Sequence, residues 1–250
     1  MNLVDSFKSH RGLMEGVNDP AIFKAVFLAG GPGSGKSFTA NDIFGIDKKL
    51  KSSFSTFGLK SVNSDNAFEA GLRKNGIDPK DLARIEAEEP ELWDKITATP
   101  GGIRDKAKKL TQKQKSFYEA GRLGMIIDGT GHVYDKIKRQ KEHAENLGYD
   151  CYMVFVNTSL DVALERNKNR DRQLPEDLVT QSWKDVQNNL GKFKGLFGGN
   201  FDIVDNTVYK PVDRQVQKAV NSFIKKPIQN PIGKKWITTA RALKKSNMIK

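Results

Sequence analysis

The residues with the clearest chemistry form one short stretch, Gly30–Ser37, which reads Gly-Gly-Pro-Gly-Ser-Gly-Lys-Ser. This spacing is the Walker A pattern, G-x-x-x-x-G-K-[ST], in which glycines let backbone N–H groups approach a phosphate with no Cβ in the way. The Lys36 ammonium group can reach the β- and γ-phosphates, and the Ser37 hydroxyl can ligate Mg²⁺. The stretch therefore predicts a binding site for a nucleoside triphosphate with Mg²⁺.

The elements on either side of this stretch are those that a phosphate loop needs. An apolar run over about 23–29 predicts a buried strand before it, and residues 38–44 predict a helix whose N-terminal dipole attracts an anion. Further apolar runs predict four more strands, at 59–63, 124–128, 149–156 and 201–205. Because helical segments alternate with these strands, we predict an α/β fold with a parallel sheet.

Two carboxylates lie at the ends of predicted strands. Asp65 comes after the second strand, and Asp128 ends the third, before Gly129 and Thr130. Ligands of open parallel sheets bind beyond the carboxyl ends of the strands, so both acids are placed for function. Two plainer interpretations stay open, since Asp65 can cap the helix that begins beside Asn66, and Asp128 can be a turn residue before a glycine.

Two helical segments complete the candidate site. Residues 66–122 are rich in Glu and Ala and predict a helical insertion, which either forms a wall over an acceptor pocket or is a plain packing layer. After the fourth strand, Arg166 and Arg170 are four residues apart and share a helix face, and Arg172 follows them. Acidic residues are interspersed among these arginines, so a solvated ion-pair face is the plainer interpretation of the run.

As a set, these motifs resemble those of the P-loop kinases of the zeta-toxin and polynucleotide 5′-kinase type, including zeta-toxin-like proteins common in tailed phages. The likeness covers about residues 23–206. It is carried by the loop, Asp65, Asp128-Gly-Thr130 and the run Arg166-x₃-Arg170-x-Arg172-x₂-Pro175. The resemblance implies a P-loop three-layer sandwich with a five-stranded parallel sheet in the order 2-3-1-4-5, and a helical insertion between the second and third strands.

The resemblance also implies a role for each residue. In the implied order, Asp128 lies next to the loop and holds Mg²⁺ through water, whereas Asp65 lies towards the acceptor as a general base. The arginines form a lid that clamps the transferring phosphate, and Thr130 orients the acceptor or a metal-bound water. The predicted catalytic residues are Lys36, Asp65, Arg166, Arg170 and Arg172. The predicted nucleotide-binding residues are Gly30, Gly31, Pro32, Gly33, Ser34, Gly35, Lys36, Ser37, Phe38 and, in the adenine pocket, Asn206; the predicted metal ligands are Ser37 and Asp128.

The activity implied is ATP-dependent transfer of the γ-phosphoryl group to a hydroxyl of a nucleotide-type acceptor, such as a nucleotide sugar. Two other functions stay open. The acceptor can be a polynucleotide 5′-hydroxyl end, or the chain can be a non-catalytic ATP- or DNA-binding component of a larger assembly.

The charge of the chain is uneven. Its formal net charge is +12, and residues 214–250 hold ten Lys/Arg and no Asp/Glu, which leaves +2 for residues 1–213. We therefore divide the chain into an N-terminal helical segment (1–22, with a helix over 3–16), a kinase domain (23–226, with the arginine lid at 159–175) and a basic tail (227–250). We expect the tail to be extended and mobile after Lys226, to form a short helix from Trp236 that folds against a partner or the body, and to bind nucleic acid.

Composition points to the cytoplasm, of the host if the protein is phage-encoded. No apolar run approaches the roughly 18–20 residues of a membrane-spanning helix, and the N-terminus lacks the apolar core of a signal peptide. The single cysteine, Cys151, lies in an apolar run and is predicted to be a buried core residue in a reducing compartment. One cysteine and three scattered histidines are too few for a zinc site.

Overall fold

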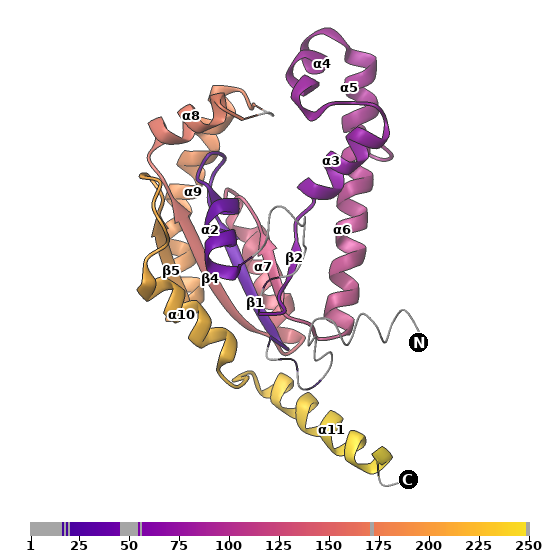
Figure 1. Cartoon of the computed structure of the whole chain (residues 1–250), viewed down its shortest axis with the longest axis vertical. Helices are drawn as coiled ribbons and strands as arrows, with labels where there is room; N and C mark the ends of the chain where they lie inside the picture. The colour runs from indigo at the N-terminus through magenta and orange to yellow at the C-terminus, as the bar shows by residue number, and fades with distance from the viewer. Residues whose placement is uncertain are drawn as a thin grey trace.

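The sheet of the protein has five parallel strands. In the computed structural model, which describes residues 17, 19, 21–45, 55, 57–170 and 173–248, their order is β2-β3-β1-β4-β5 (Figure 1). The strands are β1 (Lys24–Ala29), β2 (Lys60–Val62), β3 (Met125–Asp128), β4 (Asp150–Asn157) and β5 (Phe201–Asp205). The predicted fold class and strand order are therefore confirmed. The helix expected over 3–16 and Arg172 lie outside the described residues, as does most of the loop expected over 46–58.

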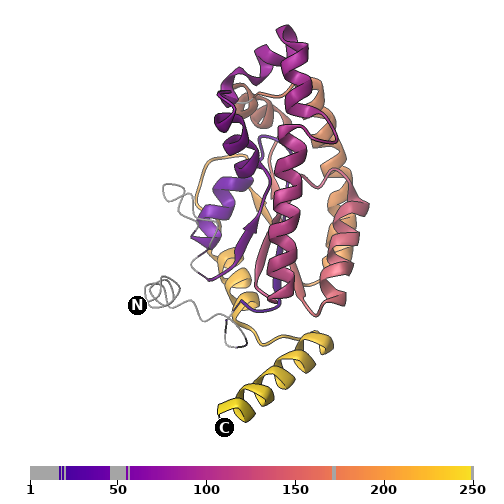
Figure 2. The same ribbon diagram turned by 90° about the vertical axis from the view of Figure 1, so that its right-hand side faces the viewer.

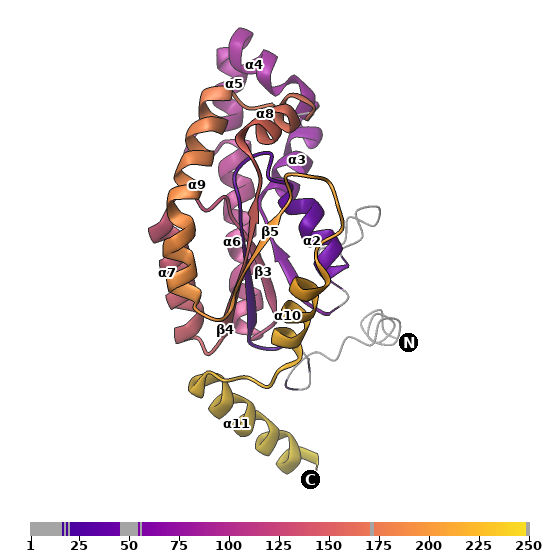
Figure 3. The same cartoon turned by 90° about the vertical axis from the view of Figure 1, so that its left-hand side faces the viewer.

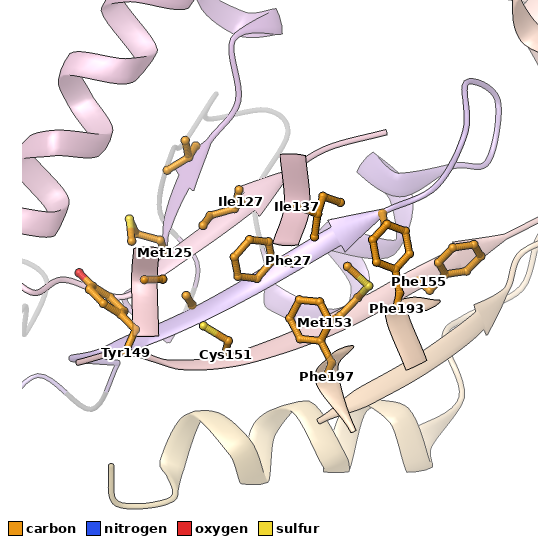
Figure 4. Close-up of a cluster of buried hydrophobic side chains, with 14 of the residues drawn as sticks. Phe27, Met125, Ile127, Ile137, Tyr149, Cys151, Met153, Phe155, Phe193 and Phe197 are labelled. Atoms are coloured by element: carbon orange, nitrogen blue, oxygen red, sulfur yellow. The ribbon is translucent and has the colours of Figure 1, made fainter. Parts of the chain in front are cut away.

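Helices cover both faces of the sheet, which makes three layers. All six residues of β1 are buried, as expected of a central parallel strand. Phe27 packs with α7 (Tyr134–Asn146) and α9 (Glu176–Phe197) on one face, where Phe193 and Phe197 contribute their rings (Figure 4). On the other face, Val26 and Leu28 pack with α2 (Lys36–Phe44) and α10 (Arg214–Lys225). The alternation along β1 therefore holds the loop that follows it between two cores.

The helical insertion between β2 and β3 has a small core of its own. Its elements are α3 (Asp65–Lys74), a 3₁₀ turn (Pro79–Asp81), α4 (Leu82–Glu88), α5 (Pro90–Thr97) and α6 (Ile103–Ala120). Phe68, Leu72, Ile85 and Ile96 are buried against one another there. The insertion rises beyond the carboxyl ends of the strands (Figure 2), and it faces α8 (Leu160–Lys168) across the top of the molecule in Figure 1. It begins at Asp65, so α3 projects from the candidate site.

The C-terminal segment differs from its prediction. Helix α11 (Pro231–Met248) includes the helix expected from Trp236 but begins at Pro231, so the expectation of an extended, detached arm is wrong. Its first turns contact the body, and the rest of the helix extends below the body (Figure 3). Proline is favoured in the first turn of a helix, and this one starts there. Trp236 packs edge-on against Phe23 with ring centroids 5.4 Å apart, and a Cβ on Gly233 would lie 2.4 Å from the Gly148 carbonyl oxygen. Within the described residues, no helix combines the length and apolarity that crossing a membrane requires.

The docking of α11 predicts a stability cost for a truncation of its anchor. Trp236→Ala should lower the free energy of unfolding by about 1–3 kcal/mol, because a partly buried aromatic contact with Phe23 is lost. Ile232 is 52% exposed on the same helix, so Ile232→Ala is the matched control and should change it by about 0.5 kcal/mol or less. Chemical denaturation measures both variants. Equally small effects would mean that α11 does not dock in solution.

Candidate active site

The phosphate loop runs where no side chain fits. Gly33 and Gly35 have φ values of 77° and 84°, in the left-handed region that favours glycine. A Cβ on Gly33 would lie 2.3 Å from the Ala163 carbonyl oxygen in α8, and one on Gly35 would lie 2.0 Å from the Asn206 amide nitrogen. The glycines are therefore required both by conformation and by close packing against α8 and the end of β5.

Three neighbours hold this loop in place. Asn206, after β5, is buried and donates a hydrogen bond of 2.8 Å from its side-chain amide to the Ser34 carbonyl. The Gly30 N–H donates to the Thr130 carbonyl after β3, at 3.0 Å. Trp183 in α9 lies against Gly31. The loop is thus preformed by contacts from three sides, and the amide of Asn206, predicted for the adenine pocket, is engaged with the loop itself.

Lys36 is folded back on the loop. Its ammonium group donates to the Gly30 carbonyl at 2.6 Å and to the Gly31 carbonyl at 3.4 Å. Burial lowers the pKa of Lys36, the negative charges of Asp128 and Asp65 raise it, and the positive charge of Arg170 lowers it further. The structure therefore brings four of the predicted site residues into one electrostatic neighbourhood.

Asn63, a residue that sequence reasoning missed, forms hydrogen bonds with both Asp65 and Asp128. Its side-chain amide donates to Asp128 Oδ2 at 2.8 Å, and its side-chain oxygen accepts the Asp65 backbone N–H at 2.8 Å. Asp65 is the first residue of α3, and Ser64 takes the cap position without a side-chain cap bond. Asn63 thus fixes the start of α3, and with it Asp65, relative to the end of β3.

The environment of Asp128 is suited to binding a cation. Burial raises the pKa of its carboxyl group, Lys36 lowers it, and Asp65 raises it. Its Oδ1 atom is buried and has no hydrogen-bond partner among the described residues. Ser37, in the first turn of α2, is exposed on the same loop. An uncompensated carboxylate oxygen and an accessible hydroxyl are the hard oxygen donors that Mg²⁺ prefers, so these residues fit the predicted metal.

The described residues hold no group of three or more His, Cys, Asp or Glu side chains arranged to ligate a metal. An ion here would therefore take most of its ligands from phosphate and water, as Mg²⁺ does at phosphate sites.

The arginines of the predicted lid approach the loop from α8. Arg166 donates from its Nη1 to the Gly33 carbonyl at 3.4 Å. Arg170 follows the end of α8, and its positive charge lowers the pKa of Lys36. Neither forms an ion pair with an acid in the part of the chain that the structure describes. The buried Asn167 between them holds the segment beyond with two bonds to the Leu174 backbone, at 2.7 and 3.0 Å.

An aromatic pair flanks the loop on the side of β5. The rings of Phe38 and Tyr209 lie 4.1 Å apart, and the Arg166 guanidinium lies 5.9 Å from the Tyr209 ring. Tyr209 is 67% exposed, so its ring is available to a planar ligand. Phe38 was predicted as a nucleotide-binding residue, and Tyr209 was not, because nothing in the sequence places it near the loop. Thr130, predicted for the acceptor side, has its hydroxyl group bonded to His132.

A glycine loop between a buried strand and a helix, with a lysine on the loop and acids at neighbouring strand ends, defines the P-loop class of nucleotide-binding folds. No family model and no curated protein matches the sequence. Solved structures match the fold. A candidate kinase from Chloroflexus aurantiacus is 13% identical, with 81% of this chain and 98% of that chain covered and a TM-score of 0.51.

A chain of the PezAT chromosomal toxin–antitoxin system of Streptococcus pneumoniae is also 13% identical, with 99% of this chain and 96% of that chain covered and a TM-score of 0.50. At such identities the likeness is one of fold. The resemblance to P-loop kinases that the motifs predicted is confirmed at that level.

The raised pKa of Asp128 predicts an effect of pH on stability. A carboxyl group whose pKa is raised on folding binds its proton more tightly in the folded state, so its ionisation destabilises the fold at neutral pH. Asp128→Asn should therefore raise the melting temperature of the nucleotide-free protein at pH 7. The gain should shrink as the pH falls through the raised pKa and vanish below the ordinary value of 3.8.

Exposed Asp94 offers the matched control, and Asp94→Asn should leave the melting curve nearly unchanged at every pH. Thermal denaturation over a pH series measures both variants. A melting temperature at pH 7 that is lower for Asp128→Asn than for the parent would show that Lys36 and Asn63 outweigh the cost of burial.

Proposed function

We propose that the protein is an ATP-dependent kinase that transfers the γ-phosphoryl group to a hydroxyl of a nucleotide-type acceptor, for example a nucleotide sugar. The observation that carries this proposal is the convergence of Lys36, Asp65, Asp128 and Arg170 beside one preformed phosphate loop. Phosphoryl transfer asks a protein mainly to position its reactants and to neutralise charge, and these residue types do both.

In this reaction the loop holds the phosphates by its backbone N–H groups, and Lys36 leaves the carbonyls of Gly30 and Gly31 to contact them. The acceptor oxygen bonds to the γ-phosphorus as the bond to the ADP oxygen breaks, and Asp65 accepts the proton of the hydroxyl. Mg²⁺, held near Ser37 and Asp128, would offset the charge of the β- and γ-phosphates. Arg166 and Arg170 stabilise the charge that spreads over the transferred group, with Arg172 as a further proposed member of this lid.

The helical insertion supports an acceptor of nucleotide size. A cavity of about 450 Å³ lies between the end of α3 and the start of α6, and Lys95 and Lys106 line it. Helix α3 has ten residues and so spans roughly 15 Å from Asp65 to this cavity. An acceptor with a hydroxyl at Asp65 and an anionic group near the two lysines would bridge that distance. A simple sugar would be too short to bridge that distance. With a nucleotide-type acceptor, the insertion serves as the predicted wall of the acceptor pocket.

Two other functions compete with this one. A polynucleotide 5′-hydroxyl acceptor would use the same loop and base. A non-catalytic role as an ATP- or DNA-binding component fits less well, because a binder would not need an acid on the acceptor side beside the lysine and arginines. Incubation with γ-labelled ATP and separate pools of nucleotide sugars, oligonucleotides and small metabolites distinguishes the three. Label in the nucleotide-sugar pool supports the proposal, and label in no pool favours the binder.

The proposed base predicts a separation of binding from chemistry. Asp65→Asn keeps the shape of the side chain but removes the proton acceptor, so transfer should fall by about 10²-fold or more while ATP affinity is retained. Lys36→Ala is the contrasting variant, and it should weaken ATP binding at least about tenfold because a charge-assisted contact to phosphate is lost. Calorimetry and single-turnover assays measure the two effects. If ATP affinity collapsed in Asp65→Asn, Asp65 would serve the metal and Asp128 would be the better base.

Asn63 predicts a change in the pH profile. Asn63→Ala removes the donor to Asp128 and the acceptor for the Asp65 N–H, so kcat should fall about tenfold or more with a smaller change in the KM for ATP. Because the lost hydrogen bond favoured the ionised carboxylate, the acidic limb of the rate profile should shift to higher pH.

Asn63→Asp keeps an acceptor for the Asp65 N–H but sets a like charge beside Asp128. It should therefore be less active than Asn63→Ala near neutral pH and partly recover as the pH falls. An unchanged pH profile in both variants would leave Asn63 as a structural residue only.

A further inference from the structure

Helices α10 and α11 carry a row of unpaired positive charges, which we call the basic face. On α10 the row is Arg214, Lys218 and Lys225, at i, i+4 and i+11, and on α11 it is Lys234, Arg241 and Lys245, at i, i+7 and i+11. At 3.6 residues per turn, each set lies within about 40° around its helix, and each spans roughly 16 Å along it. All six side chains are exposed.

These cations differ from the ion-paired cations elsewhere on the surface. Elsewhere a lysine commonly has an acid one turn away, as in Lys109 with Asp105 at 2.8 Å and Lys141 with Glu145 at 2.6 Å. Residues 214–250 contain no acid at all, and none of the six cations of the basic face forms an ion pair with a described acid. Their charge is therefore not neutralised by the protein and attracts counterions from solution.

The basic face is held in a fixed arrangement. Helix α10 is anchored on the sheet by its buried Val220, Phe223 and Ile224. At the join to α11, the Asp150 carboxylate accepts the backbone N–H groups of Gln229 and Asn230, both at 2.9 Å. The Gly148–Gly233 and Trp236–Phe23 contacts also hold the start of α11 in place. Because both helices are already ordered, binding of a ligand to the two rows would not carry a large entropy cost for ordering them.

The join adds a further positive charge. Lys226 lines a cavity of about 240 Å³ there, whose acids are already engaged, Asp150 by Lys24 at 3.1 Å and Glu145 by Lys141. Both acids that line the cavity are thus paired with lysines, and Lys226 adds one cation between the two rows.

We propose that the basic face binds nucleic acid without regard to its sequence. Duplex DNA carries about one negative charge per 1.7 Å of its axis, so it offers phosphates to rows of this length at any register. A membrane surface fits less well, because a helix that inserts in an interface turns its Trp and aliphatic side chains outwards. Trp236 and Ile237 of α11 instead pack on the protein core, which leaves Ile232 and Leu243 as the large exposed apolar side chains among the described residues of this helix. Four of the six cations are lysines, which contact phosphates as point charges, and this agrees with binding to the nucleic-acid backbone.

The α11 row of the basic face is remote from the candidate active site, whereas α10 begins beside α2, where the Val212 N–H donates to the Asp42 carboxylate at 2.6 Å. The anchors of α11, Phe23 and Asp150, lie at the amino ends of β1 and β4, whereas the phosphate loop follows the carboxyl end of β1 (Figure 1). A strand of six residues spans roughly 20 Å. The inference therefore does not depend on the proposed kinase reaction.

Fluorescence anisotropy of a labelled duplex of about 20 base pairs, titrated with the full chain between about 50 and 200 mM salt, tests the proposal. Arg214→Gln/Lys218→Gln/Lys225→Gln and Lys234→Gln/Arg241→Gln/Lys245→Gln each remove three charges. Each should weaken binding at least about tenfold at the lowest salt and reduce the slope of log K against log salt by about 2–3.

Lys136→Gln/Lys138→Gln/Arg139→Gln on α7 is the control matched for net charge, and it should keep the slope of the parent. Nucleotide affinity, measured in parallel, reports that each variant is folded. Equal losses in the α7 control would overturn the proposal in favour of net charge alone. So would an unchanged slope in both test variants, or a preference of the parent for anionic vesicles over the duplex that the same substitutions abolish.

Discussion

The arrangement of the site depends on one steric constraint, the absence of space for side chains where the phosphate loop passes α8 and the end of β5. Gly33 meets the backbone of Ala163, and Gly35 meets the amide of Asn206, which in turn holds the Ser34 carbonyl. Because the loop packs directly on α8, the helix that carries Arg166 lies against the loop, and Arg166 bonds to the Gly33 carbonyl. A phosphate held by the loop would therefore have a cation beside it.

A second constraint follows from the charges that this arrangement brings together. Burial lowers the pKa of Lys36 and raises that of Asp128, and each group partly opposes the shift of the other. Opposed shifts of this kind are typical of functional sites, where stability is lower than an apolar arrangement would allow. Asn63 limits the loss, since its amide gives Asp128 a donor and holds Asp65 in place at the same time. Burial thus acts against the charged forms of both groups, and the contacts within the site offset that cost only in part.

Much of the fold and of the candidate site could be predicted from the sequence. The contacts that could not be predicted join residues that are far apart in the chain. The loop, both acids and the first two arginines follow from local spacing and strand ends, and the sheet order follows from the resemblance. Asn63 and Asp128 are 65 residues apart, and only the pairing of β2 with β3 makes them neighbours. Tyr209 likewise reaches the loop through the position of β5. Glycine usually interrupts a helix, yet Gly233 lies inside α11. A glycine is needed there because a side chain would collide with Gly148.

The two ends of the molecule are electrostatically independent, and this has a consequence for how they act together. Phosphates bound at the α11 row would lie roughly 20 Å from the loop, the length of β1, whereas the Debye length at physiological salt is only about 8 Å. Charges bound at one end therefore do not shift the pKa of Lys36 or Asp128 at the other through solvent. Binding at the basic face would raise the local concentration of the protein on a polyanion and leave the chemistry of each molecule unchanged. Any coupling between the ends would have to pass through β1 and β4, which run from the anchors of α11 to the loop and α8.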